Sequence, residues 1–169
     1  MLKENIEILA QLATVGAAIF AGWAAWEARN AAKASRAAIE AQVVYSAMSD
    51  YFQPAMAEAL RILRAWAKKH GSNFAAVWLQ EFKDGKPEAV EVDRARRQLK
   101  GFFVKAAQLH SGGLIGDKAL RALAYVHGLN LYYDVVVPLD RALNPTAPQD
   151  AERLLANTLR RYQALPPNV

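Results

Sequence analysis

The sequence predicts an all-α protein: a single N-terminal transmembrane helix that continues into a stalk, followed by a cytoplasmic bundle of about five or six helices. Alanine accounts for 34 of the 169 residues, against 9 glycines and 7 prolines, and this composition favours helix. Residues 8–26 carry no charge, and apolar residues elsewhere recur at the three- and four-residue spacing of amphipathic helices. We expect residues 1–48 to form the membrane helix and stalk, and residues 49–169 to form the cytoplasmic domain.

The uncharged segment 8–26 has the length of a membrane-spanning helix. At about 1.5 Å per residue it spans roughly 28 Å, close to the ~30 Å hydrocarbon core of a bilayer. Alanine and glycine contribute little to insertion, so the prediction depends on the larger apolar residues. These are Ile8, Leu9, Leu12, Val15, Ile19, Phe20, Trp23 and Trp26. Two alternatives stay open: a cleaved signal peptide, which should begin with a more basic region, and a core helix that is buried on all sides.

Aromatic and basic residues near the end of this segment predict its orientation. Trp23 and Trp26 suit the headgroup region of a bilayer, and Arg29 and Lys33 follow shortly after them. Basic flanks tend to stay on the cytoplasmic side. The sequence therefore predicts a single-pass protein of the inner (plasma) membrane, with its N-terminus outside and its C-terminal domain in the cytoplasm.

Small residues recur at four-residue spacing within the same segment. Such rows let a second helix approach closely in lipid, where packing replaces the hydrophobic effect as the cause of association. The alternative is that an alanine-rich chain produces these rows by chance. A partner helix would come from another membrane protein subunit or from a second copy of this chain. We expect the helix–helix interface to consist of Ala13, Ala17, Ala18, Ala21, Gly22 and Ala25.

Turn residues and prolines divide the rest of the chain into helices. Ser49 and Asp50 are expected to cap a helix whose first turn contains Pro54. Ser111 to Gly113 is expected to end the first of two later helices, and Asp117 is expected to cap the second. The expected elements are 54–70, 73–83, 87–110, a helix from Asp117, a helix kinked at Pro138, and a final helix from Asp150.

Residue patterns that would predict catalysis or a cofactor are missing from the sequence. The three histidines are not paired at zinc-ligand spacing, cysteine is absent, and the glycines around residue 113 match neither a phosphate loop nor a dinucleotide fingerprint. Asp134 and Asp140 lie among apolar residues, and we expect them to be buried in structural ion pairs with Arg121 or Arg141. We therefore expect a non-enzymatic protein with no catalytic residues, no metal, no cofactor and no small-molecule substrate.

The predicted helix 87–110 concentrates basic residues in a chain whose net charge is +5. The candidate anion-binding residues are Arg94, Arg96, Arg97, Lys100 and Lys105. They suit phosphates of lipid headgroups or of nucleic acid. They are scattered around the helix, which is typical of a solvated face, and the absence of interleaved aromatic residues disfavours nucleic acid.

The order of parts resembles an uncharacterised bacterial family of membrane-anchored helical domains. The resemblance rests on Asp93-Arg94-x-Arg96-Arg97-x-Leu99-Lys100-x-Phe102-Phe103 after an N-terminal span, and then on Gly113-Leu114-Ile115. It implies membrane anchoring and a helical cytoplasmic domain, and it supplies no established activity or catalytic residue to carry over. We predict an accessory or structural subunit of a membrane protein complex, in contact with lipid. The alternative is a membrane-anchored regulator or sensor that binds an anionic ligand through its basic helix.

Overall fold

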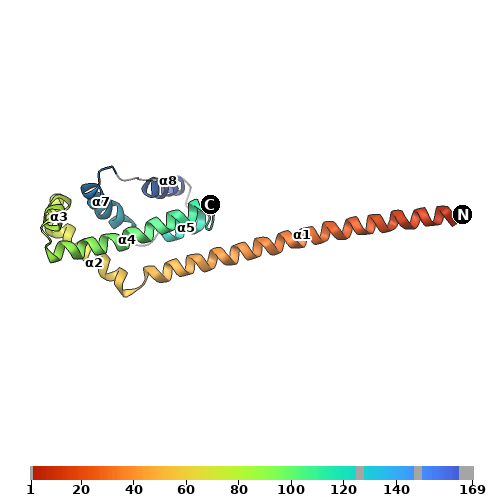
Figure 1. Ribbon diagram of the computed structural model, residues 1–169, viewed down its shortest axis with the longest axis horizontal. Helices are drawn as coiled ribbons and strands as arrows, with labels where there is room; N and C mark the ends of the chain where they lie inside the picture. The colour runs from red at the N-terminus through yellow and green to blue at the C-terminus, as the bar shows by residue number, and fades with distance from the viewer. Residues whose placement is uncertain (1, 125–127, 147–149, 164–169) are drawn as a thin grey trace. The chain divides into compact units, whose positions relative to one another are not determined.

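The computed structural model is all-helical, which confirms the all-α part of the predicted fold (Figure 1). It describes residues 2–124, 128–146 and 150–163, with side chains for residues 14, 16–124, 128–146 and 150–156. These described residues contain no strand. The chain divides into two units, Met1–Ala41 and Gln42–Val169. Each unit is considered by itself below.

Helix α1 (Leu2–Tyr51) is one unbroken helix that contributes residues to both units. In the first unit, every described side chain from Thr14 to Ile39 is exposed. In the second unit, the last turns of α1 enter the hydrophobic core, where Ala47 and Tyr51 are buried. The end of α1 is therefore part of the folded domain.

Helix α1 continues beyond the predicted caps. Ser49 and Asp50 lie inside its last turn, and helix α2 (Pro54–His70) begins after Gln53, whose side chain makes no capping hydrogen bond. Asp50 instead contacts Lys105, with Nζ 3.1 Å from Oδ2. The predicted caps are wrong, because a tertiary ion pair uses the carboxylate. The predicted first-turn position of the proline that starts α2 is confirmed.

Two buried tryptophans join the next three elements. A 3₁₀ turn (Gly71–Asn73) leads from α2 into helix α3 (Phe74–Lys83). The indole nitrogen of Trp66 donates to the backbone oxygen of Phe74 at 3.0 Å. Because a buried N–H must find an acceptor, this bond fixes the start of α3 against α2.

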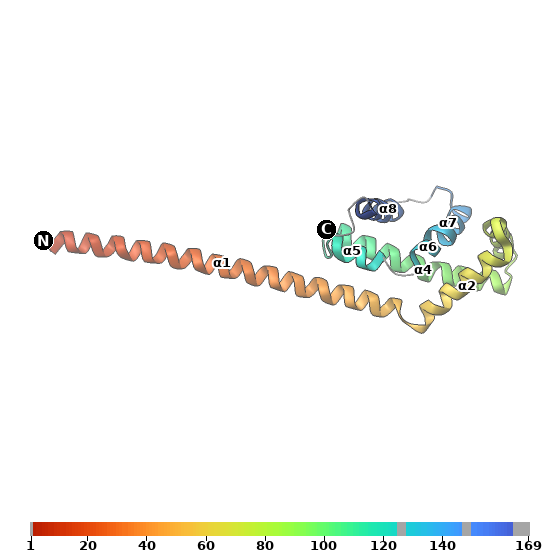
Figure 2. The ribbon, with the colours of Figure 1, turned by 180° about the vertical axis from the view of Figure 1, so that it is seen from behind.

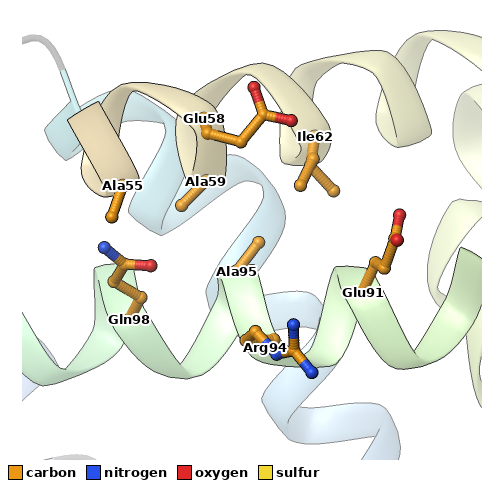
Figure 3. Close-up of a pocket in the computed structure, with 8 residues that line it drawn as sticks. All are labelled: Ala55, Glu58, Ala59, Ile62, Glu91, Arg94, Ala95 and Gln98. Carbon is orange, nitrogen blue, oxygen red and sulfur yellow. The ribbon is translucent and has the colours of Figure 1, made fainter.

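Trp78 forms the corresponding link from α3 to helix α4 (Pro87–Ser111). Its ring is fully buried, and its indole nitrogen donates to the backbone oxygen of Ala89 at 3.0 Å. Helices α2 and α4 lie side by side and run antiparallel, because Ala55 lies opposite Gln98 and Ile62 lies opposite Glu91 along their shared groove (Figure 3). This helix pair is the centre of the domain.

The remaining elements complete the core by packing against α2, α3 and α4. They are α5 (Asp117–Ala124), α6 (Gly128–Leu131), a π-helical turn (Tyr132–Val136), α7 (Val137–Leu143) and α8 (Asp150–Gln163). Figure 1 and Figure 2 show α8 beside α4 and α5, in agreement with the contacts among these helices. Asp117 lies in the first turn of α5, at the predicted start of that helix.

The π turn stands where a proline kink was expected. The backbone nitrogen of Val137 donates to the oxygen of Tyr132, five residues earlier, and Pro138, which has no N–H, follows directly. The extra residue of a π turn lets the helix pass the proline without ending. Tyr132 is 1% exposed, and its burial raises the pKa of the phenol above the ordinary 10.0.

Gly128 lies where four elements come closest. A Cβ at this position would be 2.8 Å from the Tyr51 hydroxyl oxygen, 3.1 Å from Leu99 Cδ1 and 3.3 Å from Leu60 Cδ2. The side chains of Tyr51 and Leu99 are buried and have little room to move. Glycine therefore allows α6 to pack against α1, α2 and α4 together.

We predict that Gly128→Ala destabilises the domain by about 1–3 kcal/mol, because the added methyl group overpacks this junction. Denaturant unfolding followed by circular dichroism measures the change. Adding Tyr51→Phe should recover part of the loss, since it removes the hydroxyl that is nearest to the new methyl group.

Gly101→Ala is the matched control for this prediction. Gly101 lies in α4, and a Cβ there would meet nothing within 4 Å. Alanine is the better helix former, so we expect a stabilisation of about 0.5–1 kcal/mol. A Gly128→Ala protein as stable as the Gly101→Ala protein would contradict the close packing at residue 128.

Candidate functional site

The basic residues that the sequence marks as candidate anion ligands lie in different environments. Arg96 is only 5% exposed and lies inside the domain. Lys100 is half-buried, whereas Arg94, Arg97 and Lys105 are exposed. The structure therefore does not bring these five residues into one binding surface.

Arg96 lies at the centre of an ion-pair network, here called the Arg96 cluster, which consists of Asp93, Arg96, Arg97, Lys100 and Asp140. Arg96 donates to Asp93 Oδ1 from Nε at 3.1 Å and from Nη2 at 2.8 Å, and its Nη1 donates to Asp140 Oδ1. Arg97 Nη2 lies 2.6 Å from Asp93 Oδ2. Lys100 Nζ lies 2.7 Å from Asp140 Oδ2. Each carboxylate thus contacts two cations.

Two helices supply the residues of this cluster, and a third helix contacts it. Asp93, Arg96 and Lys100 follow one face of α4 at helical spacing, and Asp140 comes from α7. On another side, the ring of Trp78 in α3 lies 5.6 Å from the Arg96 guanidinium carbon, within the range of a cation–π contact. The Arg96 cluster therefore ties α3, α4 and α7 together.

Asp140 is buried, as the sequence predicts, but its partners differ from those expected. They are Arg96 and Lys100 instead of Arg121 or Arg141. The expected partners are closer to Asp140 in the sequence, whereas the actual ones come from a helix about forty residues earlier. Tertiary packing, which local spacing does not encode, selected them.

Asp134 is exposed, so its predicted burial is wrong. The neighbouring apolar residues Tyr132, Val135 and Val136 are buried. Asp134 therefore faces outward from the π turn. Its apolar neighbours are buried, but their burial does not extend to Asp134.

The Arg96 cluster is electrostatic structure and has no reactive geometry of its own. Each of its carboxylates is held by two cations. Burial lowers the pKa of the Lys100 amine, and the neighbouring positive charge of Arg96 lowers it further. In the described part of the chain, no three potential metal ligands are grouped to hold an ion.

A groove of about 290 Å³ runs between the packed helices α2 and α4 (Figure 3). Ala59 and Ala95, which are 2% and 3% exposed, lie between the two helices. Glu58 is bound to Arg61, with oxygen–nitrogen distances of 2.6 and 2.7 Å. The other charged lining residues are the acid Glu91 and the base Arg94. With Arg61 counted, the positive and negative charges around the groove are equal in number. The lining residues are Ala55, Glu58, Ala59, Ile62, Glu91, Arg94, Ala95 and Gln98.

The part of α1 that belongs to the first unit presents the other candidate site. Large apolar side chains here are exposed: Ile19 by 69%, Phe20 by 68%, Trp23 by 57% and Trp26 by 61%. Arg29 and Lys33, predicted at the membrane interface, are exposed as well. The predicted interface residues Ala17, Ala18, Ala21, Gly22 and Ala25 are likewise exposed.

The first part of the predicted span falls outside the described side chains. This applies to residues 8–13, which include the predicted interface residue Ala13, and to Val15. Within the part of the chain that the structure describes, no helix is long and apolar enough to cross a bilayer.

Comparison with known proteins adds no relative. No protein-family model matches the chain, and neither a curated protein nor a solved structure is similar to it. The resemblance to a family of membrane-anchored helical domains therefore stays a prediction.

We predict that Arg96→Met destabilises the domain by about 3–5 kcal/mol, because it leaves two buried carboxylates without their shared partner. Denaturant unfolding of the full-length protein measures the loss. Asp140→Asn in the same chain should restore part of the stability, since it removes one of the stranded charges.

Arg94→Met is the matched control, because Arg94 lies two residues earlier in α4 and is exposed. We expect its effect to stay within about 0.5 kcal/mol. Equal losses from the two substitutions would show that burial of Arg96 does not anchor the fold.

Proposed function

We propose that this protein is a non-enzymatic, single-pass membrane protein that acts as an accessory or structural subunit of a membrane complex. In this proposal, residues 8–26 cross the bilayer and pack against a partner helix, and the folded domain lies in the cytoplasm. The observation that carries the proposal is the exposure of four large apolar side chains on the first unit of α1: Ile19, Phe20, Trp23 and Trp26.

Burial of these side chains away from water is energetically favourable. Burying one large apolar side chain is worth about 1.5–3 kcal/mol, and here four of them lie within two turns of one helix. Contiguous exposed apolar surface of this kind marks a site of contact with protein or membrane. The two tryptophans at its C-terminal end, followed by Arg29 and Lys33, fit the boundary between lipid and water.

Three large and three small residues of this helix lie on opposite faces. Ile19, Trp23 and Trp26 are spaced by four and three residues and share one face, because an α-helix has 3.6 residues per turn. Ala17, Ala21 and Ala25 share the opposite face. A wide apolar face suits lipid chains, while a face of small residues suits a closely packed helix. This division supports contact with both at once.

The absence of cysteine makes the membrane topology testable at single positions. We predict that a membrane-impermeant maleimide labels an Asn5→Cys protein in cells whose inner membrane is intact but accessible. A Ser72→Cys protein, altered in the exposed turn after α2, should be labelled only after the membrane is disrupted.

Both proteins should also stay in the membrane pellet after extraction with alkaline carbonate. Recovery of the chain in the supernatant would contradict the membrane assignment. Labelling of both positions in unbroken cells would contradict the orientation.

A second prediction concerns the small-residue face. Ala17→Leu combined with Ala21→Leu should prevent close approach of a partner helix, because the added side chains fill the contact. In mild detergent, the assembly should then shrink toward the 18.6 kDa of a single chain, as measured by light scattering with correction for detergent.

Ile19→Leu is the control, since it conserves volume on the opposite face. The assembly mass should not change in this variant. An unchanged mass in the double-leucine variant would instead show that the small-residue face is not an interface, even if the chain spans the membrane.

A further inference from the structure

A second cavity of the domain lies between α4 and α8. This crevice has a volume of about 410 Å³, within the range of ligand sites. Its walls come from the apolar residues Val104 and Ala107 of α4 and Ala151 and Leu154 of α8. The polar lining residues are Lys100, Gln108, Ser111 and Asp150.

Lys100 is the only cation among the lining residues and also belongs to the Arg96 cluster. Its side chain is 39% exposed, and its amine lies 2.7 Å from Asp140 Oδ2. An ammonium group has three N–H donors, so one bond to Asp140 leaves donors for a second acceptor. Lys100 can therefore serve the cluster and a ligand together.

The Arg96 cluster carries one positive charge more than its acids neutralise. Arg96, Arg97 and Lys100 supply three positive charges, and Asp93 and Asp140 supply two negative ones. Arg97 is exposed and solvated by water, whereas Lys100 is partly desolvated at the crevice. Burial and the charge of Arg96 lower the pKa of Lys100, and Glu152 only partly opposes them. An anion at Lys100 would supply the missing charge.

The rest of the lining defines the kind of anion. Apolar walls suit a hydrocarbon chain, and a single excess charge suits a monoanion better than a phosphate. The carboxylate of Asp150 also lines the crevice and would repel a second negative charge.

We propose that the crevice between α4 and α8 binds an aliphatic monocarboxylate, with its carboxylate at Lys100 and its chain between Val104, Ala107 and Leu154. The site lies wholly within the second unit and does not depend on membrane attachment. It gives the domain a ligand of its own, in addition to the contacts proposed for α1.

Acetylation of lysines in the full-length protein tests this site, with hexanoate as the probe. Only the neutral amine reacts, and a bound anion raises the pKa of a neighbouring lysine by about one unit or more. We therefore expect hexanoate to slow acetylation of Lys100 about tenfold, as measured at each lysine by mass spectrometry. Lys105 provides the internal control, because it pairs with Asp50 outside the crevice.

Three further arms make the test specific. Hexanol lacks the charge, adipate carries a second carboxylate, and sodium chloride matches the ionic strength; none of them should protect Lys100. Ala151→Trp fills the crevice from α8 without changing a charge, and it should abolish protection by hexanoate.

Equal protection of Lys100 and Lys105, or protection by hexanol or by salt, would overturn the proposal. Protection that persists in the Ala151→Trp protein would overturn it too. Equal protection by adipate would overturn the selection of a monocarboxylate by Asp150.

Discussion

The domain depends on how it neutralises a guanidinium group that is withdrawn from water. Burying an unpaired charge costs several kcal/mol, so Arg96 requires acceptors that are fixed in place. Asp93 is available one turn earlier in α4, but Asp140 must be brought in by α7. The ring of Trp78 covers the same group from α3. The positions of α3 and α7 are thus coupled through one side chain of α4.

Two features of the chain between α5 and α8 allow Asp140 to reach that position. Gly128 permits close contact with Tyr51 and Leu99, so α6 can begin deep in the core. The π turn then adds one residue before Pro138. One residue changes the direction of later side chains by about 100°. Without the π turn, Asp140 would point away from its present direction, and the Arg96 cluster would lose its second carboxylate.

The sequence predicts those parts of the fold that depend on local periodicity. The spans of α2, α3 and α4 follow from apolar spacing and from the glycines and prolines between them. The partners of Asp140 and the ion pair of Asp50 could not be predicted from local spacing, because each contact joins helices that are distant in the sequence. The crevice next to Lys100 was not predicted either. Its lysine was visible only as one member of a scattered basic face, since helix α8 is needed to complete the cavity.

The two units treat their charged and large apolar side chains differently. The domain pairs its buried charges internally and encloses its large apolar residues, including Trp66 and Trp78. The first unit of α1 leaves residues of the same chemical kind, Trp23 and Trp26, uncovered. Exposed apolar surface of this kind marks a site of contact with protein or membrane. This contrast is the physical reason behind the two proposals, in which α1 attaches the chain and the domain binds a ligand.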